Sequence, residues 1–344
     1  MAKKKLDAKF ALKRQVTVLG AGNMGTSIAQ IIAKNGHSVV LWNYYKDLKP
    51  LEQINKYGEN KKYLKGVKLS KNIKCEPNIG KAVAKAKIVF YAVPSFCIAD
   101  VMKASSKHLL KNTVCVDVSK GIDEKSLGIV PDVIKSNLPV AMRKLVATIS
   151  GPAIARDMVV GGFTAMNVAS KSQTSIKIIK EVMENNNLKL FPTNDVIGIE
   201  VTGSFKNVYA IAMGVCDGLK MPMNTKAALL TIALREISEL VKKMGGSAKT
   251  VYDLAGLGDL IGTGLCVRSR NRMFGEYLAK GFKVESAKKK VNQVVEGISA
   301  AKTLTQLAEK YNINLPFAKM VHNIASGKSN PKKAIQEYLA GLLT

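Results

Sequence analysis

The 344-residue sequence lacks the features that several protein classes require. It has no apolar run near the roughly 18 residues that a membrane-spanning helix needs, so a membrane span is excluded. Its three histidines are isolated, without metal-ligand spacing, and no Ser/His/Asp arrangement indicates hydrolysis. It has no tract rich in proline, glycine or serine, and 47% of its residues are apolar. We therefore expect an ordinary globular protein, with neither a metal site nor covalent catalysis.

Cysteine is scarce, and the spacing of the cysteines indicates neither disulfide pairs nor a metal site. The five cysteines are odd in number, lie far apart and form no C-x-x-C pair; they are Cys75, Cys97, Cys115, Cys216 and Cys266. This usage predicts reduced thiols. The basic amino terminus does not resemble an export signal, because Lys13 and Arg14 interrupt any apolar core. We expect a cytoplasmic protein.

Acidic residues are few, and the formal net charge is +28. Such a charge attracts polyanions and raises the alternative of nucleic-acid binding. However, only seven of the 53 basic residues are arginine, and bidentate readout of bases and phosphates favours arginine. We expect no nucleic-acid partner, and a lysine-rich surface that draws small anionic substrates.

The order of apolar segments predicts two domains. Short β-branched runs alternate with helical stretches up to about residue 193, which predicts an α/β domain with a Rossmann-type, doubly wound, mostly parallel sheet. The expected strands are 16–19, 38–42, 88–93, 113–118, 145–149, 163–169 and 188–191. After Pro192 long helical periodicities follow, starting with 195–219 behind a cap at Thr193 or Asn194. We expect a dinucleotide-binding domain at 1–193 and an all-helical substrate-binding domain at 194–344.

A glycine-rich loop separates the first predicted strand from the first predicted helix, 23–35. Gly20, Gly22 and Gly25 have the G-x-G-x-x-G spacing, with Asn23 and Met24 at the start of the helix. The three glycines allow a tight turn, a close approach of backbone N–H groups to a pyrophosphate, and close packing of helix on strand. The loop predicts a site for NAD or NADP, with a merely tight turn as the alternative.

The segment that would meet the adenine ribose carries no acidic residue at the usual position. Asn43 is neutral and Lys46 is cationic, so a 2′-phosphate would not be repelled; Asp47 lies past the strand end and could still turn inward. We expect NADP to be accepted beside NAD.

Two lysines and an arginine cluster are candidates for chemistry. Lys120 follows a predicted strand, at the edge of the sheet where ligands bind in open α/β folds. Lys206 lies in an otherwise apolar helix, a costly place for an ammonium group. Residues 268–272 hold three of the seven arginines, where Ser269 or Asn271 could cap a helix that runs to about 280. Their alternatives are solvated loop or surface side chains.

Seven motifs along the chain together resemble one family. They are Gly20–Gly25, Ser119–Gly121, Ser150–Ala155, Gly203–Val208, Leu254–Leu260, Ser269–Arg272 and Val294–Gly297. In this order they resemble the soluble, bacterial-type NAD(P)-dependent glycerol-3-phosphate dehydrogenases. The resemblance implies an oxidoreductase that interconverts dihydroxyacetone phosphate and sn-glycerol 3-phosphate, supplies phospholipid synthesis and forms a homodimer.

The resemblance also implies residue roles. Lys206 is similar to the family's catalytic acid/base, with Lys120 and Asp259 beside it. Substrate ligands implied in this way are Lys120, Gly151, Lys206, Asp259, Ser269, Arg270 and Asn271. Cofactor contacts implied beside the glycine loop are Lys120, Ala155, Arg270, Val294 and Glu296. Ala153 departs from the family pattern, because a serine commonly stands there.

The reaction sets requirements for these side chains. Ketone reduction leaves negative charge on oxygen, which needs a proton donor and electrostatic support. A lysine can supply both if burial and a second cation lower its pKa from ~10.4 toward neutrality. We expect Lys120 to be that second cation for Lys206, and Asp259 to orient one of the two amines. Glu200 lies between faces relative to Lys206, and we do not pair them.

Two other readings remain open. One is another lysine-dependent two-domain dehydrogenase, of the β-hydroxyacid or 6-phosphogluconate type, although segment 254–272 fits a triose phosphate better. The other is a non-enzymatic protein that binds nucleotides or nucleic acid through its basic surface. Retention of Lys120, Lys206, Asp259 and Arg270 argues against lost catalysis.

Overall fold

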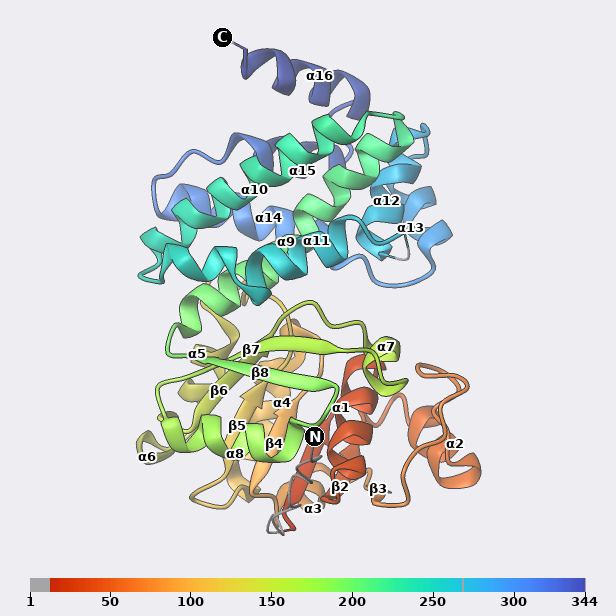
Figure 1. Cartoon of the computed structure of the whole chain (residues 1–344), viewed down its shortest axis with the longest axis vertical. Coiled ribbons are helices and arrows are strands. Elements are labelled where there is room, and N and C mark those ends of the chain that lie inside the picture. Colours follow the sequence, from red (N-terminus) through yellow and green to blue (C-terminus); the bar gives the residue numbers. More distant parts are fainter. Residues whose placement is uncertain (1–12, 268, 344) are drawn as a thin grey trace, which may run out of the picture.

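The computed structural model describes residues 13–267 and 269–343, with a sheet region at one end and a helical region at the other (Figure 1). The strands are β1 (Gln15–Leu19), β2 (Ser38–Trp42), β3 (Ile73–Cys75), β4 (Ile88–Tyr91), β5 (Val114–Asp117), β6 (Val146–Ser150), β7 (Thr164–Ser170) and β8 (Leu188–Thr193). They form one sheet in the order β3-β2-β1-β4-β5-β6-β7-β8. Only the β6–β7 pair is antiparallel, so the predicted mostly parallel, doubly wound sheet is confirmed.

The strands are apolar without alternation because both faces of the sheet are covered. Successive residues of β4 enter two different cores: Phe90 packs on one face, and Val89 and Tyr91 pack on the other. Helices α1 (Asn23–Lys34) and α8 (Gln173–Met183) pack against each other on one face, whereas α3 (Ile79–Val83), α4 (Ile98–Ser105) and α5 (Val130–Ser136) cover the other.

The helices of the sheet region are α1 (Asn23–Lys34), α2 (Lys49–Tyr57), α3 (Ile79–Val83), η1 (Ser95–Cys97), α4 (Ile98–Ser105), η2 (Ser106–His108), α5 (Val130–Ser136), α6 (Val140–Arg143), α7 (Ala155–Val159) and α8 (Gln173–Met183). Those of the helical region are α9 (Val196–Gly218), α10 (Met223–Lys243), η3 (Ala248–Tyr252), the π-helical turn η4 (Leu254–Gly258), α11 (Asp259–Gly264), α12 (Arg270–Ala279), α13 (Val284–Val291), α14 (Glu296–Lys310), α15 (Pro316–Ala325) and α16 (Pro331–Gly341). No helix within the described ranges is long and apolar enough to cross a membrane.

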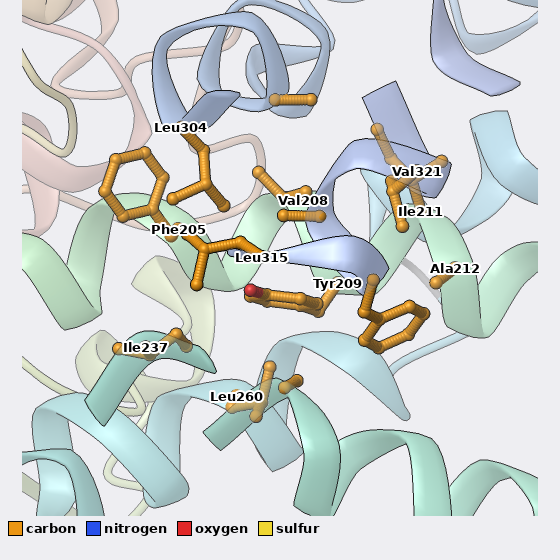
Figure 2. Packing of buried hydrophobic residues seen from close by; sticks show 14 of the residues in the cluster. Phe205, Val208, Tyr209, Ile211, Ala212, Ile237, Leu260, Leu304, Leu315 and Val321 are labelled. Atoms are coloured by element: carbon orange, nitrogen blue, oxygen red, sulfur yellow. The ribbon is translucent and has the colours of Figure 1, made fainter. Parts of the chain in front are cut away.

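Helix α9 is the central element of the helical region. It contacts β6 and β7 of the sheet and α10, α11, α12, α14 and α15 around it. Phe205, Val208 and Tyr209 of α9 lie among surrounding side chains, including Leu304 of α14 and Leu315 just before α15 (Figure 2). Because α9 is surrounded on nearly all sides, it is apolar around its circumference, and any polar side chain on it needs a partner.

Two local predictions need correction. Strand β3 was not predicted, because it has only three residues and Lys74 interrupts its apolar pattern. The cap of α9 is Asp195, and neither Thr193 nor Asn194 serves as the cap: the Asp195 side chain accepts a hydrogen bond of 2.9 Å from the Gly198 N–H. The same carboxylate accepts from the Ser247 N–H and the Thr250 hydroxyl, which joins the start of α9 to η3.

Candidate functional site

The glycine loop has the geometry of a phosphate cradle. Gly20 has a φ of +113°, and a Cβ there would lie 2.5 Å from the carbonyl oxygen of Ala92. A Cβ at Gly25 would overlap the carbonyl oxygen of Gly20, so α1 can pack this closely only with glycine. A Cβ at Gly22 would instead meet open space, and no side chain caps α1. The N–H groups at the start of α1 are thus accessible to a pyrophosphate, which fits a dinucleotide. Asn23 is exposed and Met24 half-buried at this end.

The ribose segment presents no free carboxylate. The Oδ1 atom of Asn43 accepts from the Ala21 N–H at 2.9 Å, and its Nδ2 donates to the Asp47 carbonyl at 2.6 Å. The Asp47 carboxylate is held by Lys62 at 2.8 Å and by the Tyr63 hydroxyl at 3.1 Å. Lys46 is exposed. A 2′-phosphate would therefore meet a cation and no unpaired anion here.

The two candidate lysines converge on one carboxylate. Lys120, in the loop after β5, donates to Oδ2 of Asp259 at 2.6 Å, and Lys206, on α9, donates to Oδ1 of the same residue. Asp259, the first residue of α11, is 2% exposed, whereas the Lys120 side chain keeps 18% exposure. The sequence predicts that Asp259 orients one of the two amines, and in the structure its carboxylate binds both.

Burial has opposite outcomes for the two amines. Desolvation lowers the pKa of Lys206 to about 7; the Asp259 carboxylate opposes this shift and the Lys120 charge adds to it. For Lys120 the desolvation is outweighed mainly by the Asp259 carboxylate, with a smaller contribution from Glu296, and its pKa is raised. Near pH 7 the site therefore holds one amine that exchanges its proton readily and one that stays charged.

A chain of close contacts joins this cluster to the glycine loop. Gly20 lies against Ala92 after β4, and Gly121, next to Lys120, packs against Ser95 in the same connection. Ser150, at the end of β6, packs against Gly203 of α9, where a Cβ would lie 2.5 Å from its Oγ. Both lysines thus belong to the carboxyl edge of the sheet, where the glycine loop also lies.

A side-chain clamp places Asp259. In the turn η4 before it, the Ala255 N–H donates to Oδ1 of Asn167 at 2.9 Å, and Nδ2 of Asn167 donates to Asp253 at 2.9 Å. Asn167 belongs to β7, so the sheet itself fixes the turn that presents the carboxylate. Turns of this π-helical type are frequent at functional sites.

The arginine cluster separates into two roles. Ser269 caps α12 by accepting from the Arg272 N–H, as predicted. Arg272 binds Asp217 at 2.6 Å, whereas Arg270 makes no ion pair or side-chain hydrogen bond within residues 13–267 and 269–343. Arg268 lies outside the described residues. Of the two described arginines of the cluster, Arg270 is the one whose guanidinium is available to an anion.

The remaining candidate residues lie around the starts of α12 and α14. The Oδ1 atom of Asn271 accepts from the Gly297 N–H at 2.9 Å, which joins these two helix starts and uses the carbonyl of Asn271 structurally. Glu296 accepts from Asn207, the neighbour of Lys206, at 3.4 Å. Val294 is 65% exposed.

Gly151 and Ala155 follow β6. A Cβ at Gly151 would lie 2.8 Å from the Cα of Met166, and the Ala155 carbonyl accepts from Ser27 of α1 at 2.8 Å. The segment that holds both residues is thereby attached to the helix behind the glycine loop.

Three residues at the site were not singled out from the sequence. Asn207 is buried beside Lys206 and binds Glu296; Thr263 donates to Asp259 at 3.4 Å; Asn167 holds η4. Asn207 follows Lys206 inside the motif Gly203–Val208. Thr263 lies one helical turn after Asp259, just past the motif Leu254–Leu260. These spacings are the sequence signals that indicate both residues. Nothing near Asn167 in the sequence indicates its role.

Comparisons with known proteins agree with this geometry. Residues 15–176 match the family model of the NAD-dependent glycerol-3-phosphate dehydrogenase N-terminus, and residues 195–336 match that of its C-terminus. A Bacillus subtilis protein called glycerol-3-phosphate dehydrogenase [NAD(P)+] is 36% identical over 327 residues, 95% of this chain and 94% of the relative. One of the same name from Fusobacterium nucleatum is 35% identical over 94% of this chain and 96% of the relative.

A solved structure shows the same architecture. The crystal structure of glycerol-3-phosphate dehydrogenase from Coxiella burnetii is similar with a TM-score of 0.89 and 31% identity, over 95% of this chain and 99% of that one. The chain therefore belongs to the NAD(P)-dependent glycerol-3-phosphate dehydrogenases, oxidoreductases with NAD or NADP as cofactor.

Proposed function

We propose that the protein interconverts dihydroxyacetone phosphate and sn-glycerol 3-phosphate, with Lys206 as the proton donor and acceptor. The observation that carries this proposal is the buried carboxylate of Asp259 with Lys120 and Lys206 on its two oxygens. The pKa of Lys206, lowered to about 7 mainly by burial, supports the role, because an acid/base works best when its pKa lies near the working pH.

The two amines divide the work. NADH or NADPH, when bound, supplies the hydride. Protonated Lys206 gives its proton to the C2 oxygen as negative charge develops there, and in the reverse direction neutral Lys206 accepts the proton of the hydroxyl. Lys120, which stays charged, stabilises the same oxygen electrostatically. Asp259 orients both amines, and its charge keeps Lys206 protonated often enough to act as an acid.

The phosphate of the substrate is assigned to the start of α12. The guanidinium of Arg270 is unengaged among the described residues and its planar fork suits a phosphate, and the helix amino terminus adds favourable N–H groups. We assign Ser269, Asn271 and Gly151 to the same substrate site. Arg270, Val294, Glu296 and Ala155 are assigned in addition to the nicotinamide nucleotide.

The cofactor is assigned to Gly20, Gly22, Asn23, Met24 and Gly25, with Lys120 at its nicotinamide end. The paired Asp47 and the exposed Lys46 support acceptance of NADP beside NAD. We further assign cofactor binding to a domain at 1–193 and substrate binding to one at 194–344.

One experiment tests reaction, substrate and coenzyme together. The protein is mixed with dihydroxyacetone phosphate and either NADH or NADPH, and loss of reduced nicotinamide absorbance is followed. We expect oxidation of both coenzymes that depends on the substrate and on its phosphate. Absence of turnover with dihydroxyacetone phosphate would overturn the proposal, and turnover with a β-hydroxyacid instead would favour the other lysine-dependent dehydrogenases.

The cellular setting follows from the same assignment. We propose that the enzyme is a cytoplasmic homodimer that supplies glycerol 3-phosphate for phospholipid synthesis and binds no nucleic acid. The five free cysteines support a reducing compartment. Light scattering of the purified protein tests the dimer, and a salt-sensitive gel shift would contradict the absence of nucleic-acid binding.

A further inference from the structure

Two buried carboxyl groups, those of Asp117 and Glu200, lie on the strand that precedes Lys120 and on the helix that carries Lys206. Asp117, the last residue of β5, is fully buried; its Oδ1 accepts from the Ser119 N–H at 2.9 Å and from the Ser119 hydroxyl at 2.6 Å. Its Oδ2 is buried without any hydrogen-bond partner among the described residues. A buried carboxylate oxygen without a donor is costly, so this atom needs an explanation.

The side chain of Glu200 lies within hydrogen-bonding reach of the Asp117 carboxyl group. Glu200, on α9, is 4% exposed, and its Oε1 accepts from the hydroxyl of Thr148. Thr148 of β6 is the register partner of Asp117 on β5, so Glu200 reaches the sheet at the position of Asp117. Neither carboxyl group forms an ion pair within the described parts of the chain.

The electrostatics of the pair favour a retained proton. Burial raises the pKa of Asp117 to about 7, and burial together with the charge of Asp117 raises that of Glu200 well above its usual range. Asp132 of α5 is the further charged group that acts on Glu200, and it is also acidic. Two buried carboxyl groups in contact cannot both ionise cheaply, and one retained proton converts their repulsion into a hydrogen bond.

We propose that Asp117 and Glu200 share one proton, through a hydrogen bond from the Glu200 carboxyl to Oδ2 of Asp117, and act as positioning residues for the two active-site lysines. Asp117 holds Ser119, the neighbour of Lys120, and Glu200 lies on the helix that carries Lys206. The shared proton thus links the two elements whose amines meet at Asp259. The positioning role depends on the function proposed above for the lysines, whereas the proton itself does not.

The direct test of the proton is infrared spectroscopy of the protein without substrate. Difference spectra of wild type minus Glu200→Gln at pH 7 are expected to contain the C=O stretch of a neutral carboxyl group, shifted in D2O. Glu236→Gln provides a reference for a neutral carboxyl group outside the pair, because burial raises the pKa of this second buried glutamate to about 7 as well; Glu236 is bound by the Phe317 and Ala318 N–H groups and the Tyr209 hydroxyl, away from both lysines. A difference spectrum without a neutral carboxyl band would overturn the shared proton, whatever the enzyme's activity.

A second test uses thermal stability. A group whose pKa is raised by folding binds its proton more tightly in the native state, so its contribution to stability is present below the unfolded pKa and is lost as pH rises through the folded pKa. The Tm of wild type should therefore fall between about pH 4.5 and pH 7. Glu200→Gln should show less of this fall, and Glu236→Gln should leave the contribution of the Asp117–Glu200 pair in place. An equal pH dependence of Tm in wild type and Glu200→Gln would contradict the proposal.

The positioning role is tested by turnover. Glutamine donates an N–H to Asp117 without a shared proton, so Glu200→Gln should keep kcat close to wild type, whereas Glu200→Ala should lower kcat about tenfold because the lysines shift relative to each other. Equal kcat values for the Ala and Gln variants would remove the positioning role. If Glu200→Ala does not fold, Glu200→Gln alone tests the positioning role. A loss of kcat in Glu200→Gln as large as that in Lys206→Ala would then contradict this role.

Discussion

Lys120 and Lys206, from the loop after β5 and from α9, bind opposite oxygens of one buried carboxylate. Burial is the main cause that opposes protonation of Lys206; the single Asp259 carboxylate offsets it only in part, because it serves both amines, and the Lys120 charge adds to the burial. Lys206 is therefore the side chain that can exchange a proton near neutral pH, and Lys120 is the permanent cation beside it. This division leads to the following expectations.

Replacement of the proton donor should slow the reaction strongly. Lys206→Ala is expected to lower kcat for reduction of dihydroxyacetone phosphate by at least ~10²-fold, the usual scale for a positioned general acid. Steady-state kinetics measures this effect, and Lys180→Ala, which removes an ion pair of α8, serves as the control. Near-normal turnover in Lys206→Ala would assign the proton transfer elsewhere.

Replacement of the phosphate anchor should change KM more than kcat. Arg270→Lys keeps the charge but loses the planar fork, so the KM for dihydroxyacetone phosphate should rise about tenfold. Activity toward phosphate-free dihydroxyacetone should not change. Arg156→Lys, at an exposed arginine that binds a carbonyl oxygen, is the matched control. An equal loss with both substrates would mean that Arg270 does not hold the phosphate.

Lys46 should contribute to binding of the 2′-phosphate. Because Lys46 is exposed, its contribution is small: Lys46→Ala should lower kcat/KM for NADPH by about two- to fivefold and leave that for NADH unchanged. The loss should shrink at high salt, since salt screens exposed charges. Lys49→Ala, three residues further on, should have no such effect. Equal losses with both coenzymes would contradict this role.

The cap of α9 should matter for stability and not for chemistry. Asp195 accepts three hydrogen bonds at the start of α9, so Asp195→Ala should lower the free energy of unfolding by about 2 kcal/mol, the upper end for a helix cap. Ser172→Ala, which removes the single-bond cap of α8, should cost about 1 kcal/mol. Chemical denaturation measures both. The kcat of Asp195→Ala at low temperature should match wild type, and a large loss would show that the cap also positions Lys206.

The sequence predicted those features that depend on local pattern. Unbroken apolar runs indicate strands covered on both faces, and the spacing of Gly20, Gly22 and Gly25 indicates the loop before α1, because each requirement lies within a few residues. The separation of Glu200 from Lys206 was also predicted correctly, since Glu200 binds Thr148 instead.

The missed features depend on contacts between distant segments. That Asp259 binds both lysines follows from how the loop after β5, α9 and α11 meet, and no spacing within any of them encodes it. The hold of Asn167 on η4 is likewise a contact between a strand and a turn far along the chain. Local pattern alone does not distinguish Arg270 from Arg272, and the structure shows the physical difference, because Asp217 engages Arg272.

The pH dependence of wild type and Asp259→Asn tests the central claim most directly. Reduction needs protonated Lys206, so kcat should fall as pH rises through about 7, while oxidation of glycerol 3-phosphate should rise over the same range. The Asp259 charge raises the pKa of Lys206. Asp259→Asn should therefore move the pH-dependent change in kcat to lower pH in both reaction directions, and it should reduce kcat. The account would be contradicted if the pH at which kcat changes were the same in Asp259→Asn as in wild type, or if the change persisted in Lys206→Ala.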